Sequence, residues 1–282
     1  MQLFYHGSGR LDLSRTVIMG ILNVTPDSFS DGGRYQTPEK ALERALEIQA
    51  QGAGILDVGP QSTRPGHVPV SPEEEISRLI PVLRLLQGRI HIPISVDTFY
   101  PDVAQAAIRE GASILNDVSG RLDDGMMELA ARTGAGLILM HAGDGADDTG
   151  DAAADILDTV RAFFEQALDR ADSLGLARER LCLDPGIGFG KSREGDRRLV
   201  SNLQRLMAGL PEVALLVGAS RKRVVGECGG EPVPLGARLP GTLAFHSVAQ
   251  WNGARILRVH DVAEAVRAAA VVDALMGEGA ER

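Results

Sequence analysis

Short apolar runs alternate with longer segments of helical periodicity along most of the chain. Eight runs are almost entirely apolar, and they lie at residues 17–24, 55–58, 94–97, 113–118, 137–141, 181–183, 214–218 and 255–259. Strands have this composition when both faces of a parallel sheet are buried. Between the runs, segments such as 38–51 and 72–86 place their apolar residues on one helical stripe. Eight alternating strand and helix signals predict an α/β fold, a single closed (β/α)₈ barrel.

The predicted helices carry boundary signals that agree with this arrangement. Ser71 stands before Pro72, as an N-cap residue stands before a proline in the first helical turn. Helix ends in the left-handed conformation are expected where a glycine follows a helical stretch and precedes a strand, at Gly52, Gly111, Gly134, Gly175 and Gly253. We therefore expect one domain over residues 1–282, with its core at about residues 16–276.

Composition and charge restrict the class of protein. Hydrophobic residues make up 44% of the chain and charged residues 24%, as in ordinary soluble domains. The net charge of -9 argues against a general nucleic-acid or membrane-surface binder. The apolar runs are too short to span a bilayer and the first residues lack an export signal. The two cysteines, Cys182 and Cys228, suggest neither disulfides nor a metal cluster, so a cytoplasmic protein is expected.

Polar residues close nearly every predicted strand. A barrel of this kind builds its active site at the carboxyl ends of its strands. The residues found there are Asn23, Asp57, Asp97, Asn116, Asp117, His141, Asp184, Ser220, Arg221, Lys222, Arg258, His260 and Asp261. Each alone is compatible with a structural role, but their recurrence on strand after strand predicts a functional site.

The strand-end residues fall into two chemical groups. Carboxylates, an amide and an ammonium suit the polar edge of a flat heterocycle, and this group is Asp97, Asn116, Asp184 and Lys222. A second, cationic group suits phosphate oxygens in a protein that is otherwise acidic, and it is Arg64, Arg258, His260 and the segment from Ser220 to Arg221. A glycine-rich loop at 184–191 allows close approach of the backbone to a ligand and ends in Lys191, which we expect near an anion.

Two long motifs carry a family resemblance. Residues 19–33 read MGILNVTPDSFSDGG and resemble the first signature of the dihydropteroate synthases, and residues 57–66, DVGPQSTRPG, resemble the second. Further blocks of that family follow in the same order at 95–98, 115–117, 139–141, 183–191, 220–223 and 258–262. The resemblance spans about residues 16–276 and implies a pterin-binding TIM barrel.

The resemblance implies roles for individual residues. The pterin pocket would be formed by Asp97, Asn116, Asp184 and Lys222, with Arg258 beside the ring. The diphosphate would be held by Thr63, Arg64, Arg258 and His260, with Mg²⁺ bound by Asn23. The 4-aminobenzoate would be surrounded by Phe29, Pro65, Phe189, Lys222 and Arg223. Catalysis would rest on Asp97, Lys222, Arg258, His260 and Arg64.

The activity implied by the resemblance belongs to folate biosynthesis. A pterin methylene cation would form as pyrophosphate leaves 6-hydroxymethyl-7,8-dihydropterin diphosphate with the help of Mg²⁺, and 4-aminobenzoate would capture it to give 7,8-dihydropteroate. The family also implies a homodimer, small-molecule substrates and a target for sulfonamides. With the charge and the short apolar runs given above, we expect no nucleic acid and no membrane as partners.

Two alternative functions stay open at this point. A catalytically silent pterin-binding paralogue is kept open by Pro60 and Gln61, which stand where the family has Gly-Glu. A barrel that transfers methyl from methyltetrahydrofolate to a corrinoid protein would share the pterin pocket. Such a protein would have no use for the diphosphate residues, so the intact first and second signatures argue against it.

Overall fold

The closed barrel predicted from the sequence is present. The computed structural model describes residues 2–24, 37–61, 70–143, 155–210, 213–228 and 231–279. Its parallel strands follow chain order around the barrel, and the last pairs with the first. They are β3 (Val17–Asn23), β4 (Ile55–Gly59), β5 (Ile94–Asp97), β6 (Ile114–Asp117), β7 (Gly136–Met140), β8 (Leu181–Asp184), β9 (Ala214–Val217) and β10 (Ile256–Val259).

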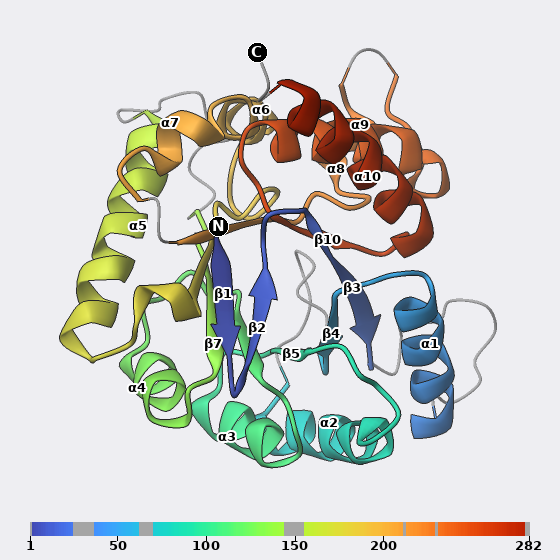
Figure 1. Cartoon of the computed structure of the whole chain (residues 1–282), viewed down its shortest axis with the longest axis vertical. Coiled ribbons are helices and arrows are strands. Elements are labelled where there is room, and N and C mark those ends of the chain that lie inside the picture. The colour runs from blue at the N-terminus through green and yellow to red at the C-terminus, as the bar shows by residue number, and fades with distance from the viewer. Residues whose placement is uncertain are drawn as a thin grey trace.

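Helices cover the outside of the barrel (Figure 1). They are α1 (Pro38–Ala50), α2 (Pro72–Leu86), α3 (Pro101–Arg109), α4 (Asp124–Thr133), α5 (Ile156–Ser173), α6 (Arg193–Ser201), α7 (Leu203–Met207), α8 (Arg223–Gly226), α9 (Leu239–Trp251) and α10 (Val262–Gly279), with 3₁₀ turns at Arg178–Arg180 and Leu235–Ala237. The Ser71 hydroxyl caps α2 by accepting from the Glu74 amide at 3.3 Å. The five predicted helix-ending glycines all have positive φ, between 72° and 109°, which confirms that expectation.

An antiparallel hairpin that the sequence analysis did not predict closes the foot of the barrel, where the strands begin. It consists of β1 (Leu3–His6) and β2 (Gly9–Asp12) and lies across the barrel strands in Figure 1. Phe4 and Leu13 are buried in a cluster with inward-facing residues of the barrel, including Met19 and Ile138. The Phe4 ring also packs on Gly136, at the start of β7, where an added Cβ would come within 2.7 Å of the ring. The hairpin therefore seals this end with apolar side chains.

The barrel interior changes from apolar to polar along each strand. Side chains two positions apart point into the same space, so each interior residue near the foot has a partner nearer the mouth. The pairs are Ile55 and Asp57, Ile114 and Asn116, Cys182 and Asp184, and Ile256 and Arg258. The foot is therefore a packed core, whereas the mouth presents a ring of polar side chains.

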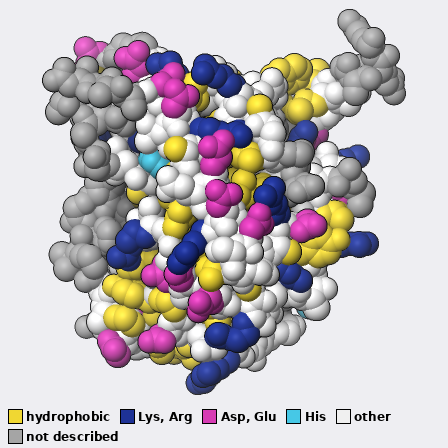
Figure 2. All heavy atoms as spheres, turned by 90° about the vertical axis from the view of Figure 1, so that its left-hand side faces the viewer, with side chains coloured by type: hydrophobic (Ala, Val, Ile, Leu, Met, Phe, Trp, Pro, Cys, Tyr) yellow, Lys and Arg dark blue, Asp and Glu magenta, His cyan; other side chains and the backbone are white. Residues whose placement is uncertain are grey.

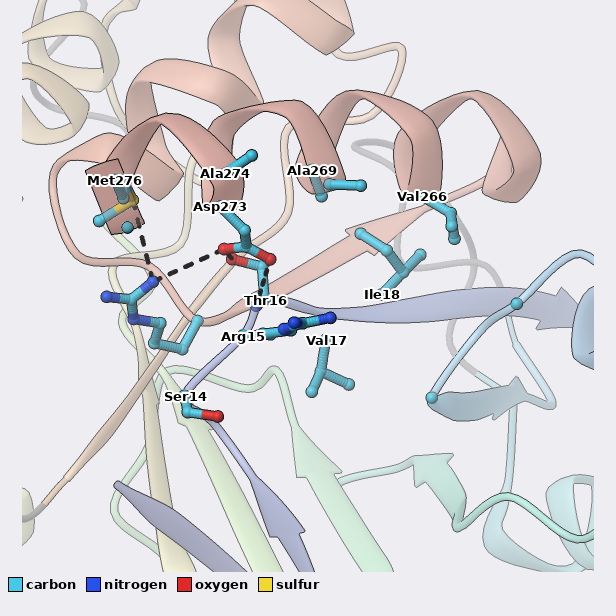
Figure 3. A pocket seen from close by; sticks show the side chains of 15 residues that line it. Ser14, Arg15, Thr16, Val17, Ile18, Val266, Ala269, Asp273, Ala274 and Met276 are labelled. Carbon is cyan, nitrogen blue, oxygen red and sulfur yellow. Dashed lines mark hydrogen bonds and ion pairs between the residues drawn. The ribbon is translucent and has the colours of Figure 1, made fainter. Parts of the chain in front are cut away.

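A cavity of about 870 Å³ lies at the foot, between the start of β3 and α10 (Figure 3). Asp273 of α10 lies at its centre and accepts hydrogen bonds from the Thr16 amide at 3.0 Å, the Thr16 hydroxyl at 3.1 Å and the Gln250 amide at 2.8 Å. Arg255 lies 3.9 Å from the same carboxylate. The Asp273 carboxylate thus fastens the chain before β3 to the last helix, at the opposite end from the polar ring.

The surface over α4 and α5 mixes both signs of charge (Figure 2). Arg170 pairs with Asp124, and Arg178 pairs with Asp172 at 2.7 Å. The acidic side chains of such a surface repel a polyanion, and the basic ones attract it. Among the described residues, no helix is both long enough and apolar enough to cross a membrane.

Candidate active site

The polar ring at the mouth is organised around Arg258. This side chain, from β10, donates from Nε to Asp57 Oδ2 at 2.7 Å and from Nη2 to Asp97 Oδ2 at 2.7 Å. Asp57 is fully buried and also accepts from the Ser95 hydroxyl at 2.7 Å and from the Asn116 amide at 3.3 Å. One guanidinium therefore fixes two carboxylates from neighbouring strands in a desolvated setting.

Asp57 is a site residue to which the sequence analysis gave no role. It was recognised as a polar strand end, but its partners lie 38, 59 and 201 positions away in the sequence. A buried carboxylate requires hydrogen bonds or an opposite charge, and here Ser95, Asn116 and Arg258 supply them. The period-two spacing from Ile55 to Asp57 was the available signal that this residue points into the barrel.

Asp97 leaves one carboxylate oxygen for a ligand. The residue is 3% exposed, and its Oδ1 has no hydrogen-bond partner among the residues that the structure describes. Burial raises the pKa of Asp97 to about 7, although Arg258 opposes the shift. An oriented oxygen in a desolvated site is suited to accept from a ligand N–H.

Asp184 and Lys222 lie beside the glycine-rich loop. The Asp184 Oδ1 accepts from the Gly186 amide at 2.7 Å, which holds this carboxylate against the start of the loop. Lys222 donates from Nζ to the Ile187 carbonyl, and the same nitrogen lies 4.1 Å from the centre of the Phe189 ring. Burial lowers the pKa of Lys222 to about 8, and Asp184 is the largest of the influences that oppose this shift.

Lys191 binds the backbone of the glycine-rich loop. Its Nζ donates to three backbone carbonyls, those of His141 at 3.0 Å, Gly186 at 3.0 Å and Phe189 at 3.1 Å. The residue is buried. An ammonium that donates to three carbonyls holds the backbone around it, so Lys191 fastens the glycine-rich loop, and its place near an anion of a ligand stays a prediction.

The structure describes only part of the cationic group that the sequence analysis predicted. The Ser220 hydroxyl lies 3.0 Å from His260 Nδ1 and accepts from the His260 amide at 3.1 Å, which joins the loops after β9 and β10. Arg221 pairs with Asp261, with 2.9 Å between Nε and Oδ2, and has a φ of 59°. Its charge is therefore already balanced by a carboxylate. Arg223 is exposed at the start of α8.

Four of the predicted site residues, Phe29, Thr63, Arg64 and Pro65, lie outside the described residues. Asn23 is described, at the end of β3, with its Oδ1 about 3.5 Å from the point where a Cβ on Gly59 would lie. A side-chain amide oxygen is the kind of hard donor that Mg²⁺ accepts alongside substrate phosphates. Within the described ranges, no group of three or more His, Cys, Asp or Glu side chains could hold a metal ion.

A buried acid supports the loop after β5. Glu75 of α2 is fully buried and accepts from the Thr98 hydroxyl at 2.7 Å, next to Asp97. Burial raises its pKa from 4.5 to about 7. Folding therefore favours the protonated form of Glu75. The contribution of this protonation to the free energy of unfolding is lost as the pH rises through about 7.

Replacing Glu75 by glutamine should stabilise the protein at pH 8 by about 2–3 kcal/mol and much less at pH 5. The amide keeps an acceptor for Thr98 but carries no charge that burial would disfavour. Melting temperatures at the two pH values measure this, with Glu73→Gln as the control because Glu73 is a solvent-facing acid in the same helical turn. An equal effect of Glu75→Gln at both pH values would contradict the explanation.

Known proteins resemble this chain over nearly its full length. The family model described as pterin binding enzyme matches residues 19–260. The dihydropteroate synthase of Escherichia coli K12 is 42% identical over 279 residues, which are 98% of this chain and 97% of that protein. A structure of the Xanthomonas albilineans dihydropteroate synthase with 4-aminobenzoic acid superposes with a TM-score of 0.86 at 40% identity, covering 95% of this chain and 96% of that one. The Clostridium difficile dihydropteroate synthase, solved in the presence of pteroic acid, gives 0.85 at 40% identity, covering 96% and 98%.

Proposed function

This chain belongs to the dihydropteroate synthase family of pterin binding enzymes, and from that membership we propose the reaction and the residue roles that follow. The protein condenses 6-hydroxymethyl-7,8-dihydropterin diphosphate with 4-aminobenzoate and releases 7,8-dihydropteroate and pyrophosphate. We also propose that the chain is one pterin-binding domain and that it acts in the cytoplasm.

The proposal rests on the hydrogen bonding of the two carboxylate oxygens of Asp97. One of its oxygens is fixed by Arg258, and the other is buried and accepts no hydrogen bond from the described part of the chain. A buried acceptor without a donor costs free energy, and the N–C–NH₂ edge of a pterin supplies donors for it. Asn116, Asp184 and Lys222 would complete the polar edge of the same pocket, with Arg258 beside the ring.

Two further groups of residues would receive the rest of the substrates. Thr63, Arg64, Arg258 and His260 would hold the diphosphate, and the contact between His260 and Ser220 supports this placement because it fixes the imidazole at the mouth. The aminobenzoate would lie among Phe29, Pro65, Phe189, Lys222 and Arg223. Phe189 and Lys222 are already in contact, which offers a ring and a cation at the same place.

The chain's own residues act mainly through charge. When the bond between the pterin methylene carbon and oxygen breaks, negative charge grows on pyrophosphate and positive charge on the pterin. The Asp97 carboxylate favours the pterin cation, whereas Arg64, Arg258 and His260 favour the leaving group. The amine of 4-aminobenzoate then bonds to the methylene carbon and gives up a proton. Mg²⁺, held by Asn23 and the diphosphate, would neutralise charge on the leaving group.

The test is an assay of the purified protein with both substrates, with and without Mg²⁺. Dihydropteroate and pyrophosphate should appear in equal amounts, and Lys222→Ala should lose most of the activity. If the pterin diphosphate binds but no product forms, the silent paralogue replaces this proposal. Methyl transfer from methyltetrahydrofolate to a corrinoid protein would identify the other alternative.

We further propose that the protein is a homodimer that pairs through α9 and α10. These helices pack on each other and expose Val248, Trp251, Val271 and Leu275 to between 47% and 62%. Large apolar side chains this exposed favour an interface. Trp251→Glu should shift the species seen in sedimentation from dimer to monomer, whereas Leu235→Glu, which alters an apolar residue equally exposed but outside both helices, should not. A monomer before any substitution would refute the pairing.

A further inference from the structure

Asp196 is a buried carboxylate to which neither the sequence analysis nor the proposed mechanism gives a role. It lies in the first turn of α6, whose N-cap is Ser192, and is only 2% exposed. Both of its oxygens accept from the Gly188 amide, at 2.9 Å and 3.0 Å. A carboxylate withdrawn from water at this position requires a compensating interaction, and the glycine-rich loop provides it.

Gly188 is the central residue of the segment that contacts Lys222. The preceding carbonyl, of Ile187, accepts from Lys222 Nζ, and the following ring, of Phe189, lies 4.1 Å from the same nitrogen. The Lys222 side chain also packs on Gly188 itself, where a Cβ would come within 2.9 Å of Cδ. Gly188 has a φ of 78°, so this close approach depends on glycine. The hydrogen bond to Asp196 therefore fixes the peptide between Ile187 and Gly188, which carries the carbonyl that Lys222 binds and precedes Phe189.

The loop is held from two sides. Lys191 fastens it from within, through the carbonyls of Gly186 and Phe189, whereas Asp196 fastens it from α6. The hydrogen bonds from Lys191 end on carbonyls of the loop, and those of Asp196 start from an amide between them. Without Asp196, the amide of Gly188 would lose its acceptor and the contacts to Lys222 would lose their support.

We propose that Asp196 is a positioning residue for Lys222. Its carboxylate holds Gly188 so that the Ile187 carbonyl and the Phe189 ring stay against the ammonium group, and its negative charge balances that of the lysine. The consequence for the reaction rests on the proposed function above, whereas the placement of Lys222 does not.

Within the described residues, charged and titratable groups from several elements act on Lys222. Asp184 of β8 and Asp196 of α6 favour its charged form, whereas Arg258 of β10 and Lys191 of the loop disfavour it. His246 of α9 also lies close enough for Lys222 to lower the pKa of its imidazole. Burial raises the pKa of Asp196 to about 6, so its charge is present at neutral pH.

The pKa of Lys222 can be measured directly, because the chain contains just three lysines, Lys40, Lys191 and Lys222. Protein labelled with ¹³C at the lysine Cε carbon should give three titrating signals, assigned by Lys222→Arg and Lys40→Arg. In Asp196→Asn the amide oxygen still accepts from Gly188 but the charge is gone. The Lys222 midpoint should then fall by roughly half a pH unit or more, because a nearby opposite charge raises a lysine pKa, while exposed Lys40 stays unchanged.

A second variant separates the hydrogen bond from the charge. Asp196→Ala removes both, so kcat/KM should fall about tenfold in Asp196→Asn and further in Asp196→Ala, as happens when the support of a site residue is removed. Glu194→Gln removes a charge from the exposed side of the same helical turn and should change neither measurement. Melting curves establish that each variant is folded.

The outcomes distinguish the two proposals. An unchanged Lys222 midpoint in folded Asp196→Ala, which lacks both the hydrogen bond and the charge, would overturn the positioning role, whatever the activity. A shifted midpoint in a protein that makes no dihydropteroate, even before substitution, would support the positioning role and refute the proposed function.

Discussion

Replacing Arg258 by methionine should reduce kcat/KM at least about a thousandfold and destabilise the fold by about 3–5 kcal/mol. The substitution leaves Asp57 and Asp97 buried without the cation that now bridges them at 2.7 Å on each side. Breaking a buried ion pair by removing one partner is costly because the remaining charge is uncompensated. Urea denaturation and steady-state kinetics at pH 8, above the raised pKa of about 7 of Asp97, would measure the two effects.

The matched control for this substitution lies three residues earlier. Arg255 precedes β10 at the foot, where its guanidinium lies 3.9 Å from Asp273 and lines the cavity of Figure 3. Arg255→Met should therefore cost little stability and leave kcat/KM within a factor of about two, because that ion pair is long and Asp273 keeps its hydrogen bonds from Thr16 and Gln250. Equal losses in the two variants would mean that Arg258 matters only as general support for the strand.

Asp97→Asn should lower kcat/KM by about two to four orders of magnitude while the protein stays folded. The amide has nearly the same shape, but it presents no negative charge to the pterin cation. In the unsubstituted protein, kcat/KM should fall as the pH drops through about 7, because the pKa of Asp97 is raised to that value and the carboxylate takes up a proton. The acidic limb of the pH profile should change in the variant.

Asp117→Asn provides the comparison for Asp97→Asn. Asp117 also ends a strand and is buried, but it follows Asn116 and so points away from the barrel interior, and its Oδ1 accepts from the Ser119 amide at 2.9 Å. This variant should keep nearly all of the activity. A comparable loss in both variants would show that any buried carboxylate at a strand end is required, and that Asp97 has no special contact with substrate.

The barrel could be predicted because its signals are local and repeated. Each buried strand is a short apolar run, and the longer covering helices carry an apolar stripe, in α2 with Ser71 as its cap. Each strand and helix unit can therefore be predicted from its own segment of sequence. The hairpin at the foot was missed although a signal existed. Gly7 and Ser8 separate two short segments, LFYH at 3–6 and GRLD at 9–12, and a glycine-serine pair between two such segments favours a tight hairpin turn.

The partners of the site residues could not be predicted. The polar strand ends were identifiable because of the barrel geometry, but nothing near Asp57 in the sequence points to Arg258, 201 positions away. Lys191 illustrates the same limit, since nothing in the sequence indicates that this lysine donates to the carbonyls of His141, Gly186 and Phe189. The partner that a polar side chain takes depends on which other polar groups still lack a hydrogen bond once the fold has packed.

The hairpin at the foot has a consequence for the order of folding. Its two strands are neighbours in sequence and can pair within microseconds, but the surface on which Phe4 and Leu13 dock is assembled from residues between Met19 and Ile256. Contacts of such long sequence separation form slowly, so docking must wait until the last strand has closed the ring. Cys182, buried in the same cluster, would record that event, because its thiol loses access to a labelling reagent when closure is complete.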